Sequence, residues 1–176
     1  WTTLAALAAE TNRIRIGLMV TGNTYRHPAI LASIAATVDI ISNGRLDLGL
    51  GAGWNEYEHS SMGIALYAPG ERIRRLDESC QIIKHLFTQD LTTFEGRYYQ
   101  LKEARREPKP VQKSHPPFVI GGSGEKLTLR VVAKHAAVWN FVNGSVEEFQ
   151  RKVGILQQHY QADRRDNQTI DLSTPV

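Results

Sequence analysis

The sequence predicts an α/β fold built on a parallel sheet with both faces covered. Three features lead to this prediction. Short apolar runs end in glycine or asparagine, segments with helical periodicity lie between these runs, and the two kinds of segment alternate along the chain. Strands buried on both faces are typical of parallel sheets, and their sequences are continuous apolar runs. We therefore expect about five parallel strands, joined by right-handed crossovers.

The expected strands are short and apolar. They cover residues 15–20, 45–51, 118–120, 137–141 and 170–173. An additional hairpin is expected over 92–101, because Glu95-Gly96 lies between two aromatic-rich arms. The proline-rich stretch 102–117 predicts a long extended connection.

The expected helices alternate with these strands. They cover residues 1–10, 28–42, 71–88, 126–135 and 145–162. Pro28 can open the second of them, because its missing N–H costs nothing at a first helical position. Asn43-Gly44 predicts a left-handed cap at its end. Ser145 and Glu148 have the spacing of a capping box at the start of the last helix.

Length and composition are those of one globular domain. The chain has 176 residues, 41% hydrophobic and 22% charged, and no apolar run reaches the ~18 residues of a membrane span. Its single cysteine, Cys80, excludes an internal disulfide, and we expect it to be buried in a helix. The six histidines lack metal-ligand spacing, so no metal site is expected. We expect a cytoplasmic protein without a membrane partner.

The small positive charge does not indicate a nucleic-acid partner. The net charge is +3, and a nucleic-acid-binding surface would gather its basic residues on one face. Within residues 71–78 the arginines instead alternate with acids, as Glu71, Arg72, Arg74, Arg75, Asp77 and Glu78. We interpret this segment as a solvated helix face.

Functional residues are expected just past the carboxyl ends of the strands, as in other parallel α/β folds. Those ends read Met19-Val20-Thr21-Gly22, Gly51-Ala52-Gly53-Trp54, Gly121-Gly122-Ser123-Gly124 and Trp139-Asn140. The Gly121–Gly124 turn precedes a helix, so its N–H groups and the helix dipole can bind an anion. A tight turn without a ligand explains the same residues equally well. Gly51 and Gly53 leave space either for a flat ring system or for ordinary packing.

Two histidines lie on strand-end loops. His27 and His59 could each serve in acid–base chemistry, although a structural role is the commoner one for a lone histidine. A serine hydrolase is not indicated, because the G-x-S-x-G turn is absent.

A series of short motifs extends along nearly the whole chain. In order they are Tyr25–Ala29 (YRHPA), Gly44–Trp54 (GRLDLGLGAGW), Glu58-His59, Glu71–Leu76 (ERIRRL), Phe94–Tyr99 (FEGRYY), Pro108–Gln112 (PKPVQ), Pro116-Pro117, Ile120–Glu125 (IGGSGE) and Trp139-Asn140. In this order they resemble the luciferase-like monooxygenase superfamily, specifically its branch that depends on the deazaflavin coenzyme F420.

The resemblance implies a (β/α)8 TIM barrel. The chain would hold about strands 3 to 7 of it, as a single domain over residues 1–176 that is truncated at both ends. Family members carry an acidic residue and a histidine at the end of the second strand, and that segment is not in this sequence. The resemblance also implies a homodimer when full length and a small-molecule substrate.

The resemblance implies F420 as the cofactor and hydride transfer as the chemistry. The expected cofactor-binding residues are Met19, Val20, Gly53, Trp54, Gly121, Gly122, Ser123, Gly124, Trp139 and Asn140. One alternative is an FMN-dependent monooxygenase that uses O2, and another is a non-catalytic binding or structural subunit.

Two further expectations follow from the resemblance. Relatives carry a cis bond at the position of Met19-Val20. We expect it in the complete enzyme and expect a trans bond in this chain, which lacks the neighbouring second strand. F420-dependent relatives can carry a glutamate where this chain has Trp54, so Glu56, Glu58 or His59 are the candidates to replace its acid–base role.

Overall fold

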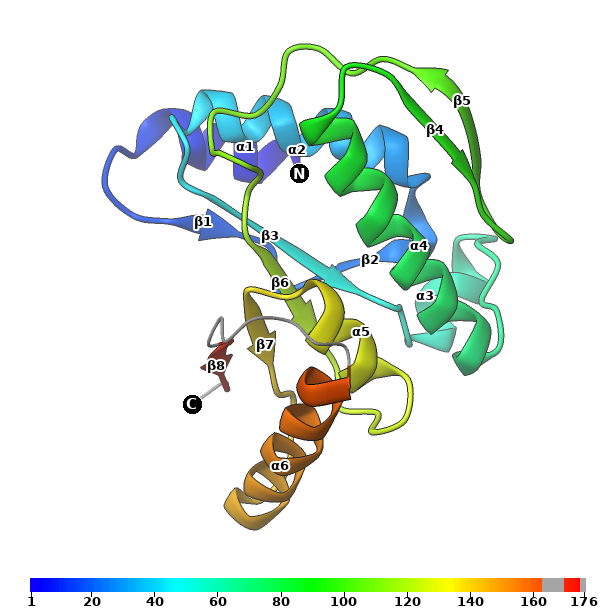
Figure 1. The fold of residues 1–176 in the computed structure, drawn as a ribbon. Helices are drawn as coiled ribbons and strands as arrows, with labels where there is room; N and C mark the ends of the chain where they lie inside the picture. The colour runs from blue at the N-terminus through cyan, green and yellow to red at the C-terminus, as the bar shows by residue number, and fades with distance from the viewer. Residues whose placement is uncertain (163–169, 175–176) are drawn as a thin grey trace.

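The computed structural model describes residues 1–162 and 170–174, and its centre is a parallel sheet (Figure 1). Among the described residues the sheet has six strands: β1 (Ile16–Gly17), β2 (Thr21–Gly22), β3 (Leu46–Gly51), β6 (Phe118–Gly121), β7 (Val138–Asn140) and β8 (Asp171–Ser173). Their order is β1-β3-β6-β7-β8, and β2 also pairs with β3. Every pairing in this sheet is parallel.

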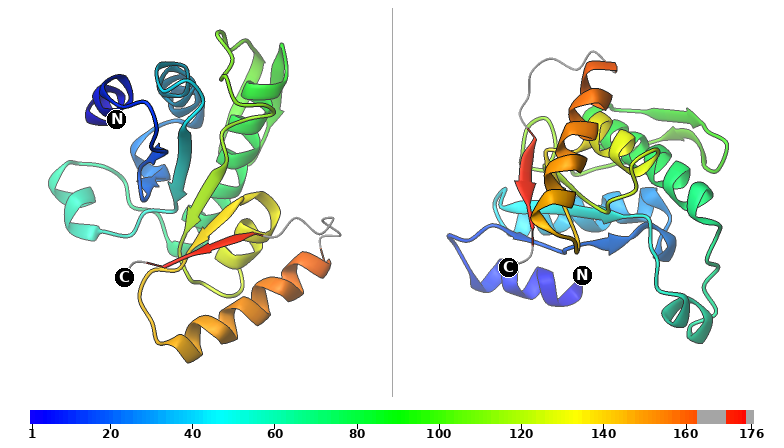
Figure 2. Two further views of the ribbon diagram at one scale, coloured as in Figure 1. Left: turned by 90° about the vertical axis from the view of Figure 1, so that its left-hand side faces the viewer. Right: turned by 90° about the horizontal axis from the view of Figure 1, so that it is seen from below.

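Strand order follows chain order, which is the arrangement of consecutive strands in a (β/α)8 barrel. Because β1 and β2 share one position beside β3, the sheet has five strand positions. The prediction of an incomplete barrel is therefore confirmed. The longer helices follow the outer side of the curved sheet (Figure 2, left). In a barrel the inner face is filled by strand side chains instead.

The helices occupy the predicted places with small shifts. They are α1 (Thr2–Glu10), α2 (Pro28–Ile41), α3 (Glu56–Ser61), α4 (Pro69–Thr88), α5 (Thr128–His135) and α6 (Val146–Ala162), with a 3-10 turn η1 (Asn23–Tyr25). Pro28 is at the first position of α2, and Asn43 and Gly44 follow its end with φ of 53° and 80°. The Ser145 hydroxyl accepts a hydrogen bond from the Glu148 N–H at 3.2 Å, so the predicted cap is confirmed.

Two helix boundaries correct the sequence prediction. Residues 56–61 were expected to be a loop, but they form α3, whose first turn is capped by the Asn55 side chain. Asn55 Oδ1 accepts from the Glu58 N–H at 3.1 Å, a local signal that was present in the sequence. Helix α5 begins at Thr128 and not at Lys126, so the turn after β6 is longer than expected.

The predicted hairpin is confirmed as β4 (Thr92–Glu95) paired with β5 (Gln100–Ala104). Its turn spans Gly96 to Tyr99 and not Glu95-Gly96, because the Gly96 N–H bonds to the Tyr99 carbonyl at 2.9 Å. The Glu78 carboxylate of α4 accepts hydrogen bonds from three backbone N–H groups of this turn.

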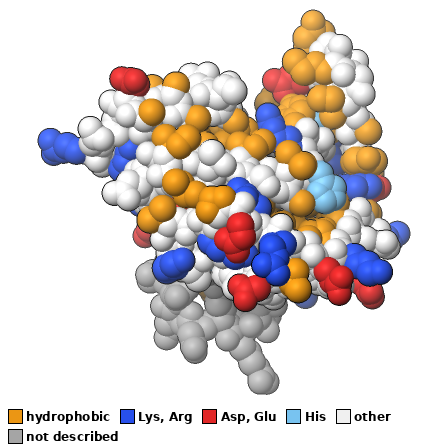
Figure 3. All heavy atoms as spheres, turned by 90° about the horizontal axis from the view of Figure 1, so that it is seen from above, with side chains coloured by type: hydrophobic (Ala, Val, Ile, Leu, Met, Phe, Trp, Pro, Cys, Tyr) orange, Lys and Arg blue, Asp and Glu red, His pale blue; other side chains and the backbone are white. Residues whose placement is uncertain are grey.

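The charged segment of α4 is therefore not a solvated face. Of its three arginines only Arg74 is exposed. Arg75 pairs with Glu71 at 2.7 Å and stacks over the Tyr67 ring, while Asp77 bonds to α5. On the face seen from above, basic, acidic and hydrophobic side chains are interspersed (Figure 3).

The first predicted strand, residues 15–20, is shorter than expected: only β1 (Ile16–Gly17) lies within it, and β2 (Thr21–Gly22) follows just beyond it, so that residues 16–22 form a divided strand. Between them the Met19-Val20 peptide bond is cis, so the expectation of a trans bond in this chain is wrong. The neighbouring strand β3 has glycines at 49 and 51, facing this segment. A Cβ at Gly49 would lie 1.7 Å from the Leu18 carbonyl oxygen. The divided strand therefore approaches β3 more closely than any side chain at position 49 would allow.

The core lies between the sheet and its helices. It includes Leu46, Leu48 and Leu50 of β3 and the buried side of α4. Cys80 is fully buried there, as predicted, and burial raises the pKa of its thiol. The thiol therefore stays protonated and packs as a small apolar group.

Candidate functional site

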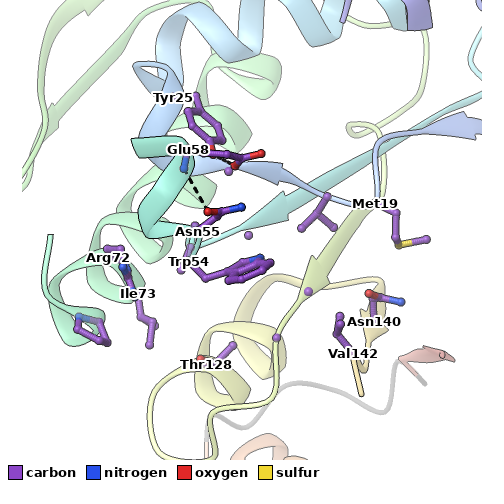
Figure 4. Close-up of a pocket in the computed structure, with 18 residues that line it drawn as sticks. Met19, Tyr25, Trp54, Asn55, Glu58, Arg72, Ile73, Thr128, Asn140 and Val142 are labelled. Atoms are coloured by element: carbon purple, nitrogen blue, oxygen red, sulfur yellow. Dashed lines mark hydrogen bonds between the residues drawn. The ribbon is translucent and has the colours of Figure 1, made fainter. Parts of the chain in front are cut away.

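A cavity of about 560 Å³ opens at the carboxyl ends of β2, β3, β6 and β7 (Figure 4). Its volume is within the range of cavities that bind cofactors and small ligands. Seven of the ten residues expected to bind a cofactor line it: Met19, Val20, Gly53, Trp54, Gly121, Gly122 and Asn140. Ser123, Gly124 and Trp139 do not line it.

The floor of the cavity consists of backbone. Gly22 of β2 pairs in register with Gly51 of β3, and Gly121 of β6 pairs with Asn140 of β7. The pairing of Leu50 with Ile120 places Gly51 next to Gly121. Three strands therefore end at one level without a Cβ, and Asn140 of β7 is the next residue in this row.

The Val20 side chain covers these glycines. A Cβ added at Gly51 would lie 2.7 Å from Val20 Cγ2, and one at Gly121 would lie 3.2 Å from it. A Cβ added at Gly53, whose φ is 81°, would lie 2.8 Å from Thr24 Oγ1. A side chain at Gly51 or Gly53 would therefore collide with a protein side chain, while the backbone of both residues lines the cavity.

The turn after β6 is held from behind and open at its front. Trp139 is fully buried, and its Nε1 donates to the Gly122 carbonyl at 2.8 Å. The Gly122 N–H bonds to the Asn140 carbonyl at 3.2 Å. Within the described residues, the N–H groups of Ser123 and Gly124 make no backbone hydrogen bond. Two adjacent free N–H groups at the cavity edge are suited to an anion.

Side chains of α5 and α6 support this turn. Thr128 lies beneath it, since a Cβ at Gly122 or Gly124 would meet its side chain at 3.0 Å or 2.8 Å. Lys152 is 7% exposed, and its ammonium donates to the Ser123 carbonyl at 2.8 Å while pairing with Glu148 at 3.0 Å. The turn is therefore a fixed part of the fold.

A polar pair forms one wall of the cavity. The Tyr25 hydroxyl donates to Glu58 Oε2 at 2.5 Å, and the two side chains point toward one another in Figure 4. The hydrogen bond to Glu58 raises the pKa of Tyr25 above its ordinary value, helped by burial and by the Glu58 charge. Glu58 is one of the two catalytic candidates, and it faces the cavity.

His59, the other candidate, is 1% exposed and does not line the cavity. Its Nδ1 lies 2.6 Å from the Asn55 carbonyl oxygen, and its Nε2 lies 2.7 Å from Thr24 Oγ1. The imidazole also stacks on the Tyr25 ring, with centroids 5.0 Å apart. His59 thereby holds the wall in place through protein contacts.

The remaining acid–base candidates lie elsewhere. His27 caps α2, where its Nδ1 accepts from the Ala29 N–H at 3.2 Å, and burial lowers its pKa. This is the structural role that is commoner for a lone histidine. Glu56 is exposed on α3 and does not line the cavity.

Several lining residues were not identified from the sequence. They are Tyr25, Asn55, Pro69, Arg72, Ile73, Thr128 and Val142. Tyr25, Arg72 and Ile73 lie in motifs of the resemblance, which was the available signal. Asn55, Pro69 and Thr128 depend on where α3, α4 and α5 begin, and Val142 follows β7.

Two large apolar side chains at the cavity are mostly uncovered. Trp54 is 79% exposed and Met19 is 67% exposed. Figure 4 shows them on opposite sides of the cavity. Exposed apolar side chains around a concave site are typical of ligand-binding surfaces.

The described part of the chain lacks two further features. Residues 1–162 and 170–174 contain no group of three or more His, Cys, Asp or Glu side chains that could hold a metal ion. Within these ranges, no helix is both long enough and apolar enough to cross a membrane.

Comparison with known proteins agrees with the fold. An F420-dependent glucose-6-phosphate dehydrogenase of Microbacterium testaceum is 37% identical over 126 residues, which are 71% of this chain and 37% of that protein. An FMNH2-dependent dimethylsulfone monooxygenase of Pseudomonas putida is 32% identical over 149 residues, covering 84% of this chain and 40% of the other.

Solved structures share the fold at lower identity. An F420-dependent secondary alcohol dehydrogenase, solved with an F420-acetone adduct, superposes with a TM-score of 0.87 at 20% identity. The match covers 99% of this chain and 52% of that one. The chain spans between 37% and 57% of the length of the curated relatives it matches. The family model described as luciferase-like monooxygenase matches residues 1–176, and the chain therefore belongs to this family.

Proposed function

We propose that the protein is an oxidoreductase that binds coenzyme F420 in the cavity at the strand ends and acts on a small organic substrate. One observation carries the proposal: the cavity joins uncovered apolar side chains to a glycine turn with free N–H groups. A cofactor with a flat ring and a phosphate needs both kinds of surface.

The residues present fit such a group. Val20 and Met19 would support the ring, with Val20 fixed by the glycines of β3 and β6. Trp54 would cover its other face. The free N–H groups of Ser123 and Gly124 would bind the phosphate next to Gly122, beyond the residues that line the cavity.

When bound, F420 supplies hydride transfer, and the protein supplies orientation and electrostatics. Glu58 would exchange a proton with the substrate, because it is the carboxylate that lines the cavity. The Tyr25 hydroxyl fixes this carboxylate by its hydrogen bond. This arrangement would take the place of the glutamate that relatives carry at the position of Trp54.

A second candidate is an FMN-dependent monooxygenase. It is favoured by the FMNH2-dependent relative, which matches a larger part of this chain than the F420-dependent one does. The same ring support and glycine turn would serve FMN. The two candidates therefore differ in cofactor and not in the residues that hold it.

Titration of the purified protein with F420 and with FMN tests the proposal. We expect saturable binding of F420 with quenching of tryptophan fluorescence, and about five- to tenfold weaker binding in Trp54→Ala from the lost stacking. Tyr57→Ala is the matched control, because Tyr57 is also 79% exposed but does not line the cavity. Binding of FMN alone would transfer the proposal to the second candidate. Binding of neither would refute both and favour a non-catalytic subunit.

A further inference from the structure

A second, smaller cavity of about 200 Å³ lies beside the first, and Arg72 lines both. It is enclosed by the loop after β2, the start of α4 and the hairpin. Three arginines line it, Arg26, Arg72 and Arg75, together with His27. No aspartate or glutamate is among its described lining residues. The cavity is therefore strongly positive.

Only one of these arginines is neutralised by a carboxylate. Arg75 pairs with Glu71 at 2.7 Å and stacks over Tyr67, with its guanidinium carbon 3.9 Å from the ring centroid. Arg26 and Arg72 form no ion pair within the described residues. The Nε of Arg72 is buried and has no hydrogen-bond partner in the described structure. Two guanidinium groups thus share a small cavity without an anion to balance them.

A buried amide opens onto the same cavity. Asn23 is 3% exposed, and its Nδ2 donates to the Tyr99 hydroxyl at 3.3 Å. Its Oδ1 is buried without a partner among the described residues. An unpaired buried polar atom destabilises a fold by roughly 1–3 kcal/mol. A ligand that carries both negative oxygens and an O–H group would satisfy the arginines and this oxygen together.

We propose that this cavity is a binding site for a phosphate group, either free phosphate or the end of a phosphomonoester. Guanidinium groups bind phosphate oxygens through paired hydrogen bonds. The phosphate O–H of the monoprotonated form donates to Asn23 Oδ1. The site is separate from the glycine turn and does not depend on the cofactor proposed for the first cavity.

The thermal stability of the cofactor-free protein tests this site. Inorganic phosphate and glycerol phosphate are each titrated against chloride at matched ionic strength, and a saturable rise in Tm is expected from ligand linkage. Arg26→Gln and Arg72→Gln are each expected to weaken the apparent affinity by at least about tenfold, from the loss of charge-assisted hydrogen bonds. Arg74→Gln is the matched control, because Arg74 lies on the same helix, is exposed and lines neither cavity.

A second readout separates binding from a structural role. In phosphate-free buffer Arg26→Gln should leave Tm unchanged or raise it, because the change removes repulsion between unpaired cations. A structural arginine would give a lower Tm. Stronger binding of glycerol phosphate than of phosphate would identify the ester as the ligand, and equal binding would identify free phosphate. The proposal is overturned if neither probe raises Tm, if Arg26→Gln keeps the full effect, or if Arg74→Gln loses it equally.

Discussion

Replacing Gly49 by alanine tests whether the closeness of the divided strand to β3 depends on a missing side chain. The new Cβ would lie 1.7 Å from the Leu18 carbonyl oxygen and 2.9 Å from the Leu18 carbonyl carbon. Both are backbone atoms, so no change of rotamer relieves the contact. Non-bonded heavy atoms prefer separations of about 3.5 Å, so the Leu18 carbonyl would have to move by roughly 2 Å.

The expected loss in the free energy of unfolding is at the upper end of the range for overpacked sites. Inserting a methyl group into a packed site costs about 1–3 kcal/mol, and a rigid backbone neighbour favours the higher value. For a chain of this length a loss of about 3 kcal/mol lowers Tm by roughly 6–12 °C. The displacement would also move Val20, so we expect weaker cofactor binding in the same variant.

Urea denaturation and thermal melting measure the effect. Gly154→Ala is the matched control, because Gly154 lies in α6 and an added Cβ meets no atom within 4 Å. This control should stabilise the protein by about 0.5–1 kcal/mol, as expected for glycine replaced in a helix. The reasoning fails if Gly49→Ala lies within about 0.5 kcal/mol of the parent, the range of an ordinary surface change.

Three further predictions concern single side chains. Arg45 donates hydrogen bonds to four backbone carbonyls, so Arg45→Met should cost about 2–4 kcal/mol in urea denaturation, whereas exposed Arg13→Met should change little. Glu58→Gln should lower the pKa of Tyr25 toward its ordinary value. Ultraviolet titration of the phenol measures this pKa, and an unchanged value in the variant would contradict the prediction. Burial lowers the pKa of His135 despite its bond to a carboxylate, so its unfolded form takes up a proton first as pH falls. The contribution of neutral His135 to the free energy of unfolding is therefore present above about pH 6.5 and is lost as the pH falls below this value. Melts at pH 7.5 and pH 5.5 should show a smaller decrease in Tm for His135→Gln than for the parent protein.

The parts of the fold that the sequence predicted correctly are those decided over a few residues. The start of α2 depends on Pro28 and on a cap from the residue before it. Its end depends on left-handed residues Asn43 and Gly44, and the start of α6 on Ser145 and Glu148. All these interactions join residues at most four apart, so a short window of sequence contains both partners.

The features that the sequence did not predict depend on distant partners. The strand expected at 15–20 ends at Gly17, and the segment after it approaches Gly49 of β3, more than 25 residues later, too closely for a side chain there. Glu78 was assigned to a solvated face, but its partners are the backbone N–H groups of a turn about 20 residues away. Apolar periodicity and charge alternation do not identify such partners. Helix α3 is different, because its N-terminal cap joins Asn55 to the Glu58 N–H, only three residues away, and is therefore a local signal in the sequence.

The glycines at the strand ends show why a site is harder to predict than a fold. A glycine indicates that something comes close to the backbone, but not what it is. At Gly51 the space of a Cβ is taken by Val20, and at Gly53 by Thr24, while the backbone of both glycines lines the cavity. A ring in the cavity would also contact Val20, whose side chain packs against Gly51. A substitution at Gly51 should therefore alter binding by displacing Val20, in addition to any direct effect on the cavity wall.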